Sequence, residues 1–89
     1  MRIEPEIYPR IKDIGFRIGV KEVSGSRSWD TCHSRFVFRG WNGRLDEISI
    51  PDLWILDNQW ERIDRTVIEA CERVVNDPLL FPPQWMACE

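Results

Sequence analysis

The sequence predicts a single small α+β domain in which a three-stranded antiparallel meander sheet packs against a long C-terminal helix, in the order αβββα. Two runs on either side of an Asn-Gly pair alternate apolar with polar residues, which indicates a hairpin. From residue 58 onward, apolar residues recur at spacings of three and four, as on one face of a helix. A chain of 89 residues without a long Gly/Ser linker has room for one hydrophobic core, so residues 1–89 are expected to form one domain.

The first element is expected to be a short helix over about residues 5–13. Its apolar residues are spaced by four and three, with Gly15 as a possible stop: Ile7, Ile11 and Ile14. Pro9 leaves the start of this helix open, because a proline inside a helix removes one hydrogen bond and clashes with the preceding turn, at a cost of about 3 kcal/mol. A helix that begins at Pro9 is the alternative.

Residues 14–23 are expected to form the first strand, because the apolar residues at 14, 16, 18 and 20 of the run IGFRIGVKEV alternate with polar residues or glycine. Residues 24–34, SGSRSWDTCHS, are rich in turn-forming residues and are expected to be a long loop. An arginine and an aromatic residue on such a loop, Arg27 and Trp29, suit recognition of a partner. The alternative is that Trp29 folds back onto the sheet.

The second and third strands flank the Asn-Gly pair, and their register decides which side chains share a face. A two-residue turn would place Phe38 opposite Glu47 and bury a carboxylate beside phenylalanine. A three-residue turn, Trp41-Asn42-Gly43 with the glycine left-handed, places Phe36 opposite Ile48 instead. Since a slip of one residue exchanges the two faces of a strand, we predict the register that unites the apolar residues. The outer face then carries Arg35, Val37, Arg39 and Trp41 on one strand and Leu45, Glu47 and Ser49 on the other.

A long amphipathic helix is predicted next, with Asn58 as its N-cap and Glu61 completing a capping box. It is expected to end at Asn76-Asp77-Pro78. Its core-facing residues would be Trp60, Ile63, Val67, Cys71 and Val74. On the opposite side a ladder of alternating charge would stabilise the helix by about 0.2 to 0.5 kcal/mol per pair, through Glu61, Arg65, Glu69 and Arg73.

The tail over residues 78–89 is too apolar for a solvated terminus. We expect its large side chains to pack either on this domain or on another chain: Leu79, Leu80, Phe81 and Trp85. In the second case, the tail would close a homodimer across a two-fold axis.

No catalytic, metal or cofactor site is predicted. His33 directly follows Cys32, and adjacent side chains in a strand or loop point apart, which argues against a nucleophile and base pair. Asp30, Cys32 and His33 fall short of the four ligands that structural zinc requires. The glycines match no phosphate-binding loop. The chain is therefore predicted not to be an enzyme and to bind neither a metal nor a cofactor.

Cysteine content and hydropathy indicate the compartment. Cys32, Cys71 and Cys88 are odd in number and lack CxxC spacing, which is typical of reduced thiols. No apolar run reaches the roughly 18 residues that span a bilayer, and no basic start is followed by an apolar run. These patterns predict a cytoplasmic protein that does not contact membranes.

Charge is distributed unevenly along the chain. Residues 1–44 hold nine Arg or Lys and five Asp or Glu, whereas residues 45–89 hold three and ten. Ten of the twelve basic residues are arginine, which favours ordered, bidentate or stacked contacts over simple solvation. The two halves therefore offer a basic and an acidic candidate surface.

The αβββα order resembles that of double-stranded RNA-binding domains. That family places basic residues at the start of its second helix, where this chain has the acidic segment 57–61, DNQWE, which would repel phosphate. Nucleic-acid binding is kept as an alternative, through a basic sheet face with Trp41 for base stacking: Arg17, Arg35, Arg39 and Arg44.

The same order, at similar length and with acidic character, resembles certain small phage-encoded anti-CRISPR proteins. That resemblance implies an inhibitor whose acidic half mimics nucleic acid, through a surface of Asp52, Asp57, Glu61 and Glu69. The alternative interpretation is a well-solvated acidic helix.

The leading hypothesis is a small non-enzymatic protein-binding module, an inhibitor or regulator of a larger macromolecular partner. Trp and Arg dominate the binding energy of protein interfaces, and five Trp in 89 residues is more than a core of this size readily hides. The expected contact residues are Arg35, Arg39, Trp41, Trp29, Phe81 and Trp85.

Overall fold

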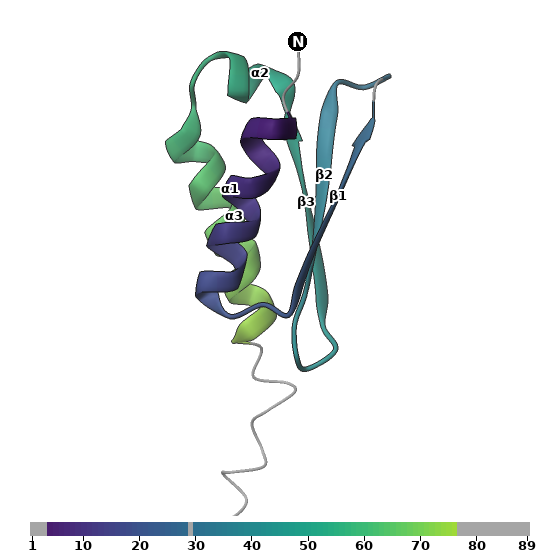
Figure 1. Ribbon diagram of the computed structural model, residues 1–89, viewed down its shortest axis with the longest axis vertical. Helices are drawn as coiled ribbons and strands as arrows, with labels where there is room; N and C mark the ends of the chain where they lie inside the picture. Colours follow the sequence, from purple (N-terminus) through teal and green to yellow (C-terminus); the bar gives the residue numbers. More distant parts are fainter. Residues whose placement is uncertain (1–3, 29, 77–89) are drawn as a thin grey trace, which may run out of the picture.

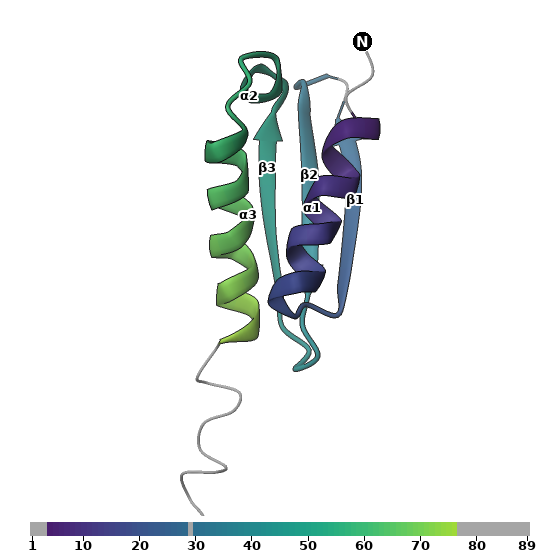
Figure 2. The same cartoon turned by 60° about the vertical axis from the view of Figure 1, so that its left-hand side comes forward.

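The computed structural model describes residues 4–28 and 30–76. Its elements follow the order α1 (Glu4–Ile18), β1 (Glu22–Ser28), β2 (His33–Arg39), β3 (Leu45–Pro51), α2 (Asp52–Leu56) and α3 (Trp60–Val75). The strands form an antiparallel meander in the spatial order β1-β2-β3, and α1 and α3 lie side by side on one of its faces (Figures 1 and 2). The predicted α+β class and αβββα order are confirmed, with α2 as an additional short helix.

Helix α1 extends through residues 14–18, so the prediction of a first strand over 14–23 is wrong there, and only Glu22 and Val23 of that run lie in a strand. Ile14 and Ile18 continue the helical spacing of Ile7 and Ile11, and all four pack into or against the core. Phe16, which the strand pattern placed in the core, is 50% exposed. A run that alternates with period two also contains the four-residue spacing of a helix, and burial beside the earlier isoleucines decides between them.

Helix α1 also passes through Pro9 without a break. The proline is exposed, whereas Ile7 and Ile11 on the opposite side are fully buried. Burying an isoleucine side chain stabilises by about 1.5 to 3 kcal/mol, so two of them offset the hydrogen bond and the strain that the proline costs. The alternative of a helix that begins at Pro9 is therefore wrong.

Two glycines determine how α1 meets the sheet. A Cβ on Gly15 would lie 2.9 Å from Cγ2 of Val23, so this glycine lets the helix approach β1 closely instead of ending the helix. The helix ends at Gly19, whose φ of +119° few other residues adopt. The N–H groups of Gly19 and Val20 both donate to the carbonyl of Gly15 at 3.0 Å, which closes the final turn.

Most of strand β1 lies within residues 24–34, which were predicted to be a loop. Its positions on the helix-covered face are Val23, Gly25 and Arg27, which pair with Phe38, Phe36 and Ser34 of β2. Only one of these three positions is apolar, so the strand lacks the alternation that sequence analysis requires. The loop prediction for residues 24–34 is corrected to a strand followed by a short turn that ends at His33.

Strand β1 also forms one edge of the sheet. The hydroxyl of Tyr8 in α1 donates to the carbonyl oxygen of Val23 at 3.2 Å, so Val23 directs its backbone groups away from β2. Since backbone direction alternates along a strand of an antiparallel pair, Gly25 faces the same edge. Helix α1 therefore contacts the strand edge as well as the sheet face.

The register of β2 and β3 is confirmed. Phe36 lies opposite Ile48, and Phe38 lies opposite Asp46 rather than Glu47. Gly43 has a φ of +86° and donates to the carbonyl of Gly40 at 3.1 Å, as expected of a three-residue turn with a left-handed glycine. The apolar residues of both strands consequently share the face that α1 and α3 cover.

The core-facing side of α3 is also confirmed, because Ile63, Val67, Cys71 and Val74 are buried. The start of the helix was predicted wrongly, since α2 precedes it and Asn58 adopts a left-handed φ of +55° in the turn between them. The four residues of the predicted charge ladder make no ion pair with one another within the described chain; Arg73 instead bonds Asp46 of β3 at 2.8 Å. The predicted contacts of the tail, residues 78–89, lie outside the described residues.

Candidate interaction surface on the outer sheet face

The face of the sheet opposite α1 and α3 is not covered by either helix (Figures 1 and 2). Alternation along the strands assigns its residues in three columns: Glu22, Ser24, Ser26 and Ser28 of β1; His33, Arg35, Val37 and Arg39 of β2; and Leu45, Glu47 and Ser49 of β3. All of them are exposed or half-buried, whereas the residues between them on β2 are buried. We call this surface the outer face.

One end of the outer face is apolar. Leu45 is 55% exposed and lies near Val37 around an open cavity of about 480 Å³ that Asp46 and Glu47 complete. Trp41, in the adjoining turn, is 76% exposed, and the ammonium group of Lys21 lies 5.4 Å from the centre of its ring. Large apolar side chains exposed together are typical of protein contact sites.

The charges of the outer face are balanced. Arg35 lies 3.9 Å from Glu47, and Arg39 lies 3.5 Å from Glu22, with all four side chains more than half exposed. Such exposed pairs contribute little to stability, about 0 to 1 kcal/mol each. Arg17, predicted as part of a basic sheet face, lies on α1 and pairs with Asp13 at 3.2 Å. The sheet therefore lacks the concentrated positive charge that sequence analysis considered.

The other end of the outer face is hollow and polar. An open pocket of about 510 Å³ lies beside the β1–β2 turn, lined by Ser26, Arg27, Ser28, Thr31, His33, Arg35 and Ser49. Ser26 and Ser49 flank Arg35 from the two neighbouring strands, so one long side chain stands between two short ones. Among the described residues, neither of these two serine hydroxyls makes a hydrogen bond, so both can bond a ligand. We call this hollow the hydroxyl pocket.

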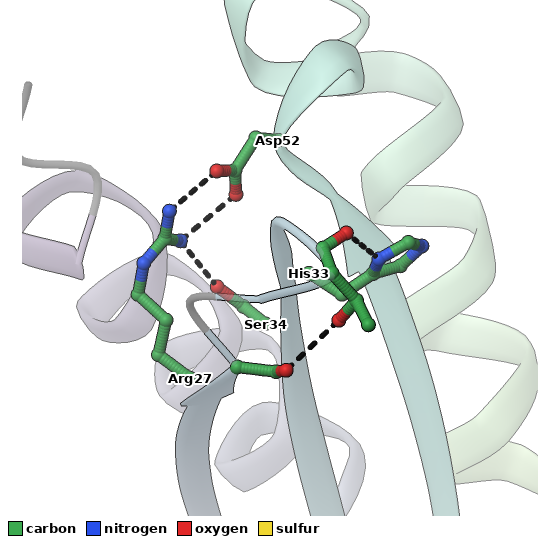
Figure 3. Close-up of polar contacts among 6 residues, drawn as sticks. Arg27, His33, Ser34 and Asp52 are labelled. Carbon is green, nitrogen blue, oxygen red and sulfur yellow. Dashed lines mark hydrogen bonds and ion pairs between the residues drawn. The ribbon is translucent and has the colours of Figure 1, made fainter.

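Local hydrogen bonds orient the turn side of the hydroxyl pocket. The hydroxyl of Thr31 donates to Ser28 Oγ at 2.9 Å. His33 Nδ1 lies 2.6 Å from the carbonyl oxygen of Thr31, and because a carbonyl can only accept, this nitrogen carries the proton (Figure 3). The Nε2 atom of His33 and the proton of Ser28 remain available to a ligand.

On the helix-covered face, Arg27 joins the end of β1 to α2. Its guanidinium donates to both carboxylate oxygens of Asp52, one at 2.8 Å, and to Ser34 Oγ at 3.3 Å (Figure 3). The Arg27 and Asp52 side chains are only 11% and 13% exposed. The expectation that Asp52 belongs to an exposed acidic surface is therefore wrong, because a nearly buried ion pair occupies its carboxylate.

The remaining residues of the predicted acidic surface are exposed, but cations lie among them. Asp57, Glu61 and Glu69 are exposed on α3 and the turn before it. Arg62 lies over the ring of Trp54, 4.1 Å from its centre. Arg10 of α1 bonds Asp64 at 2.7 and 2.8 Å, which raises the pKa of Arg10. The acidic half is thus broken into smaller patches.

The two described cysteines have different environments. Cys32 is exposed in the β1–β2 turn with a φ of +55°, and Cys71 is buried in α3. Burial, followed by the nearby charges of Asp46 and Glu72, raises the pKa of Cys71 to about 12, so this thiol is protonated and inert at neutral pH. Within residues 4–28 and 30–76, no three side chains of His, Cys, Asp or Glu are grouped as metal ligands.

The structure places three of the six predicted contact residues, Arg35, Arg39 and Trp41, on the outer face or its adjoining turn, all of them exposed. The other three lie outside the described residues: Trp29, Phe81 and Trp85. The hydroxyl pocket was not predicted, because residues 24–34 were expected to form a loop. The serines at alternate positions of SGSRS were the available signal for a polar strand face.

None of the described helices has the length and apolarity needed to cross a bilayer. No family model matches this chain, and no curated protein or solved structure shows significant similarity to it.

Proposed function

We propose that this protein is a small non-enzymatic binding module that attaches to a partner protein through its outer face, as an inhibitor or regulator of that partner. The observation that carries the proposal is the sheet face that neither α1 nor α3 covers, with Leu45 and Trp41 exposed and Val37 half-buried beside paired charges. Protein interfaces combine an apolar centre rich in aromatic residues and arginine with a polar rim. The outer face offers both components.

The charge balance of the outer face favours a protein over a nucleic acid as the partner. Nucleic-acid binding gains most of its free energy when lysine and arginine neutralise phosphates. Here Glu22 and Glu47 already lie beside the two strand arginines and would approach the phosphates with them. Exposed carboxylates alternating with arginines can instead pair with charges of both signs on a protein.

Mimicry of nucleic acid by the acidic half has less support. A mimic needs a row of carboxylates that stand in for phosphates. Asp52 is occupied by Arg27, and Asp64 is occupied by Arg10. The exposed Glu61 and Glu69 share α3 with exposed arginines at 62 and 65, which weakens the local negative potential.

The test compares two leucines of similar exposure at different places. Leu45 on the outer face is 55% exposed, and Leu53 on α2 is 61% exposed. The tagged protein would capture partners from cells of its source, mass spectrometry would identify them, and calorimetry would measure affinity for the purified partner. Leu45→Arg should weaken binding at least about tenfold, as expected for an arginine forced into an apolar contact, whereas Leu53→Arg should not. Equal effects of the two changes would contradict an interface on the outer face.

The two alternatives, an interface on the acidic half and a nucleic-acid partner, predict different results. If Glu61→Lys and Glu69→Lys weaken binding while Leu45→Arg does not, the acidic half is the interface. If the wild-type chain shifts RNA or DNA in a gel at low salt and Arg39→Ala removes the shift, nucleic acid is the partner. Circular dichroism of each variant checks that a loss of binding does not reflect unfolding.

A further inference from the structure

We propose that the hydroxyl pocket binds a phosphate monoester, presented by a phosphorylated serine or threonine of the partner protein. This inference rests on the proposed function, because it assigns chemistry to one end of the same outer face. The pocket differs from the rest of that face in the hydroxyl groups that line its volume of about 510 Å³ together with the exposed Arg35. These are the features of an anion site open to solvent.

Arg35 supplies the positive charge of the pocket. It lies on the central strand, and Ser26 and Ser49 lie directly opposite it on the two neighbouring strands. Short side chains on both sides leave the guanidinium accessible and place a hydroxyl on each flank. The planar guanidinium donates in parallel to two oxygens of a phosphate, and the serines can donate to the same group.

The residues beside the β1–β2 turn supply a further hydrogen-bond donor. Ser28 already accepts a hydrogen bond from Thr31 at 2.9 Å, so its own proton is free to point into the pocket. His33 is held by the Thr31 carbonyl at Nδ1, and its Nε2 makes no hydrogen bond among the described residues.

Two nearby carboxylates would repel a bound phosphate and therefore weaken its binding. Glu47 lies 3.9 Å from Arg35 Nε, beyond hydrogen-bonding distance, and Asp30 is exposed in the adjacent turn. A phosphate that displaces Glu47 would form shorter, charge-assisted bonds to the guanidinium. Removing the charge of Glu47 should therefore increase the affinity for phosphate.

The surroundings indicate that the phosphate belongs to a protein chain. Val37 follows Arg35 by two residues on the same face, a spacing of about 7 Å, and Leu45 lies beyond it near the same apolar cavity. A peptide with its phosphate in the hydroxyl pocket can thus reach the apolar end with side chains a few residues away. A nucleic-acid backbone would need a second cation along the path, where Arg39 is paired with Glu22.

The test measures the binding of four probes to the 89-residue chain by two-dimensional NMR and calorimetry. The probes are O-phosphoserine, a nine-residue peptide with a central phosphoserine flanked by leucines, the same peptide without phosphate, and a ten-nucleotide RNA. Phosphoserine should bind with a Kd on the order of 1 mM and shift the amide signals of Ser26, Arg35 and Ser49. The phosphopeptide should bind at least tenfold more tightly than the unphosphorylated peptide.

Arg39 provides a matched control for Arg35, because it lies on the same strand and face and also pairs with a glutamate. Arg35→Gln should weaken phosphoserine binding at least tenfold, Arg39→Gln should change it less than twofold, and Glu47→Gln should strengthen it. The proposal is overturned if the phosphate makes no difference to peptide binding, if the two arginine variants behave alike, or if a ten-nucleotide RNA binds the same residues more tightly than the phosphopeptide.

The experiments distinguish a hydroxyl pocket that does not bind phosphate from an outer face that is not the protein interface. Phosphoserine alone tests the pocket without the apolar end. If it does not bind while Leu45→Arg still abolishes partner binding, the pocket is refuted and the protein interface stands. If it binds and Arg35→Gln removes it while no outer-face change affects partner binding, the pocket is an anion site, the interface lies elsewhere and the phosphoprotein assignment is overturned.

Discussion

The two faces of the same three strands contrast sharply in what they do. On the face beneath α1 and α3, Phe36, Phe38 and Ile50 are at most 3% exposed, and the ion pair of Arg27 and Asp52 is nearly buried. On the outer face, the intervening residues of the same strands are exposed or half-buried, and their ion pairs are open to water. Neighbouring residues in one strand thus differ in environment: one set is packed in the core, and the other is open to solvent.

Substitutions on the helix-covered face should therefore change stability, whereas substitutions on the outer face should change binding. Stability depends on area removed from water and on buried groups that lose their partners. An exposed residue on the outer face contributes little of either. Matched substitutions on the two faces should therefore change the free energy of unfolding by different amounts.

The largest difference in the free energy of unfolding should separate substitutions at two adjacent residues, one on each face of the sheet. Phe38 is fully buried, and Phe38→Ala should lower the free energy of unfolding by about 3 to 5 kcal/mol, because it removes a phenyl ring and leaves a cavity. Val37→Ala, one residue away on the outer face, should stay within about 1 kcal/mol. Urea denaturation followed by circular dichroism measures both. Similar losses for the two variants would mean that the outer face is covered in solution.

The next largest difference in stability should separate the loss of the nearly buried ion pair from the loss of an exposed one. Arg27→Ala leaves Asp52 nearly buried without its cation, which should cost about 3 kcal/mol. Arg39→Ala breaks the exposed pair with Glu22 and should cost less than about 0.5 kcal/mol. Thermal unfolding of both variants and of Asp52→Asn gives the comparison. If Arg39→Ala proved as costly as Arg27→Ala, the outer charges would have a structural role that their exposure does not suggest.

The effect that is smallest within any one pH unit is a dependence of stability on pH that arises on the helix-covered side. Between the ordinary thiol pKa of 9.0 and the raised value of about 12, folded Cys71 retains a proton that the unfolded chain has lost. The free energy of unfolding should therefore fall as pH rises through this range, by up to about 1.4 kcal/mol per pH unit, and this contribution is fully present below pH 9. Cys71→Ala should remove this slope, and Cys32→Ala in the exposed turn should keep it. A parent protein and Cys71→Ala variant with the same slope would refute the assignment.

The parts of the fold that sequence analysis predicted correctly are those with strong periodicity. The β2–β3 register followed from the need to unite Phe36 and Phe38 with Ile48, and the core face of α3 followed from spacings of three and four. In both cases local pattern and tertiary burial point the same way. The outer positions of Arg35 and Arg39 came with that register.

The first strand was misplaced for a physical reason. Its helix-covered face holds a glycine that admits the rings of Tyr8 and Phe36, and an arginine whose partner, Asp52, is 25 residues away in sequence. Neither position carries an apolar signal, and the compensating contacts are long-range. The hydroxyl pocket could not be predicted for the same reason, since it exists only once β1 lies beside β2.

One contact of α1 bears on whether the β1 edge of the sheet can accept a further strand. Strand β1 is an open edge, and such edges invite a further strand to pair with their free backbone groups. An incoming strand would need the carbonyl of Val23, which the hydroxyl of Tyr8 already occupies. A single phenol thereby shortens the stretch of the β1 edge along which a further strand could pair.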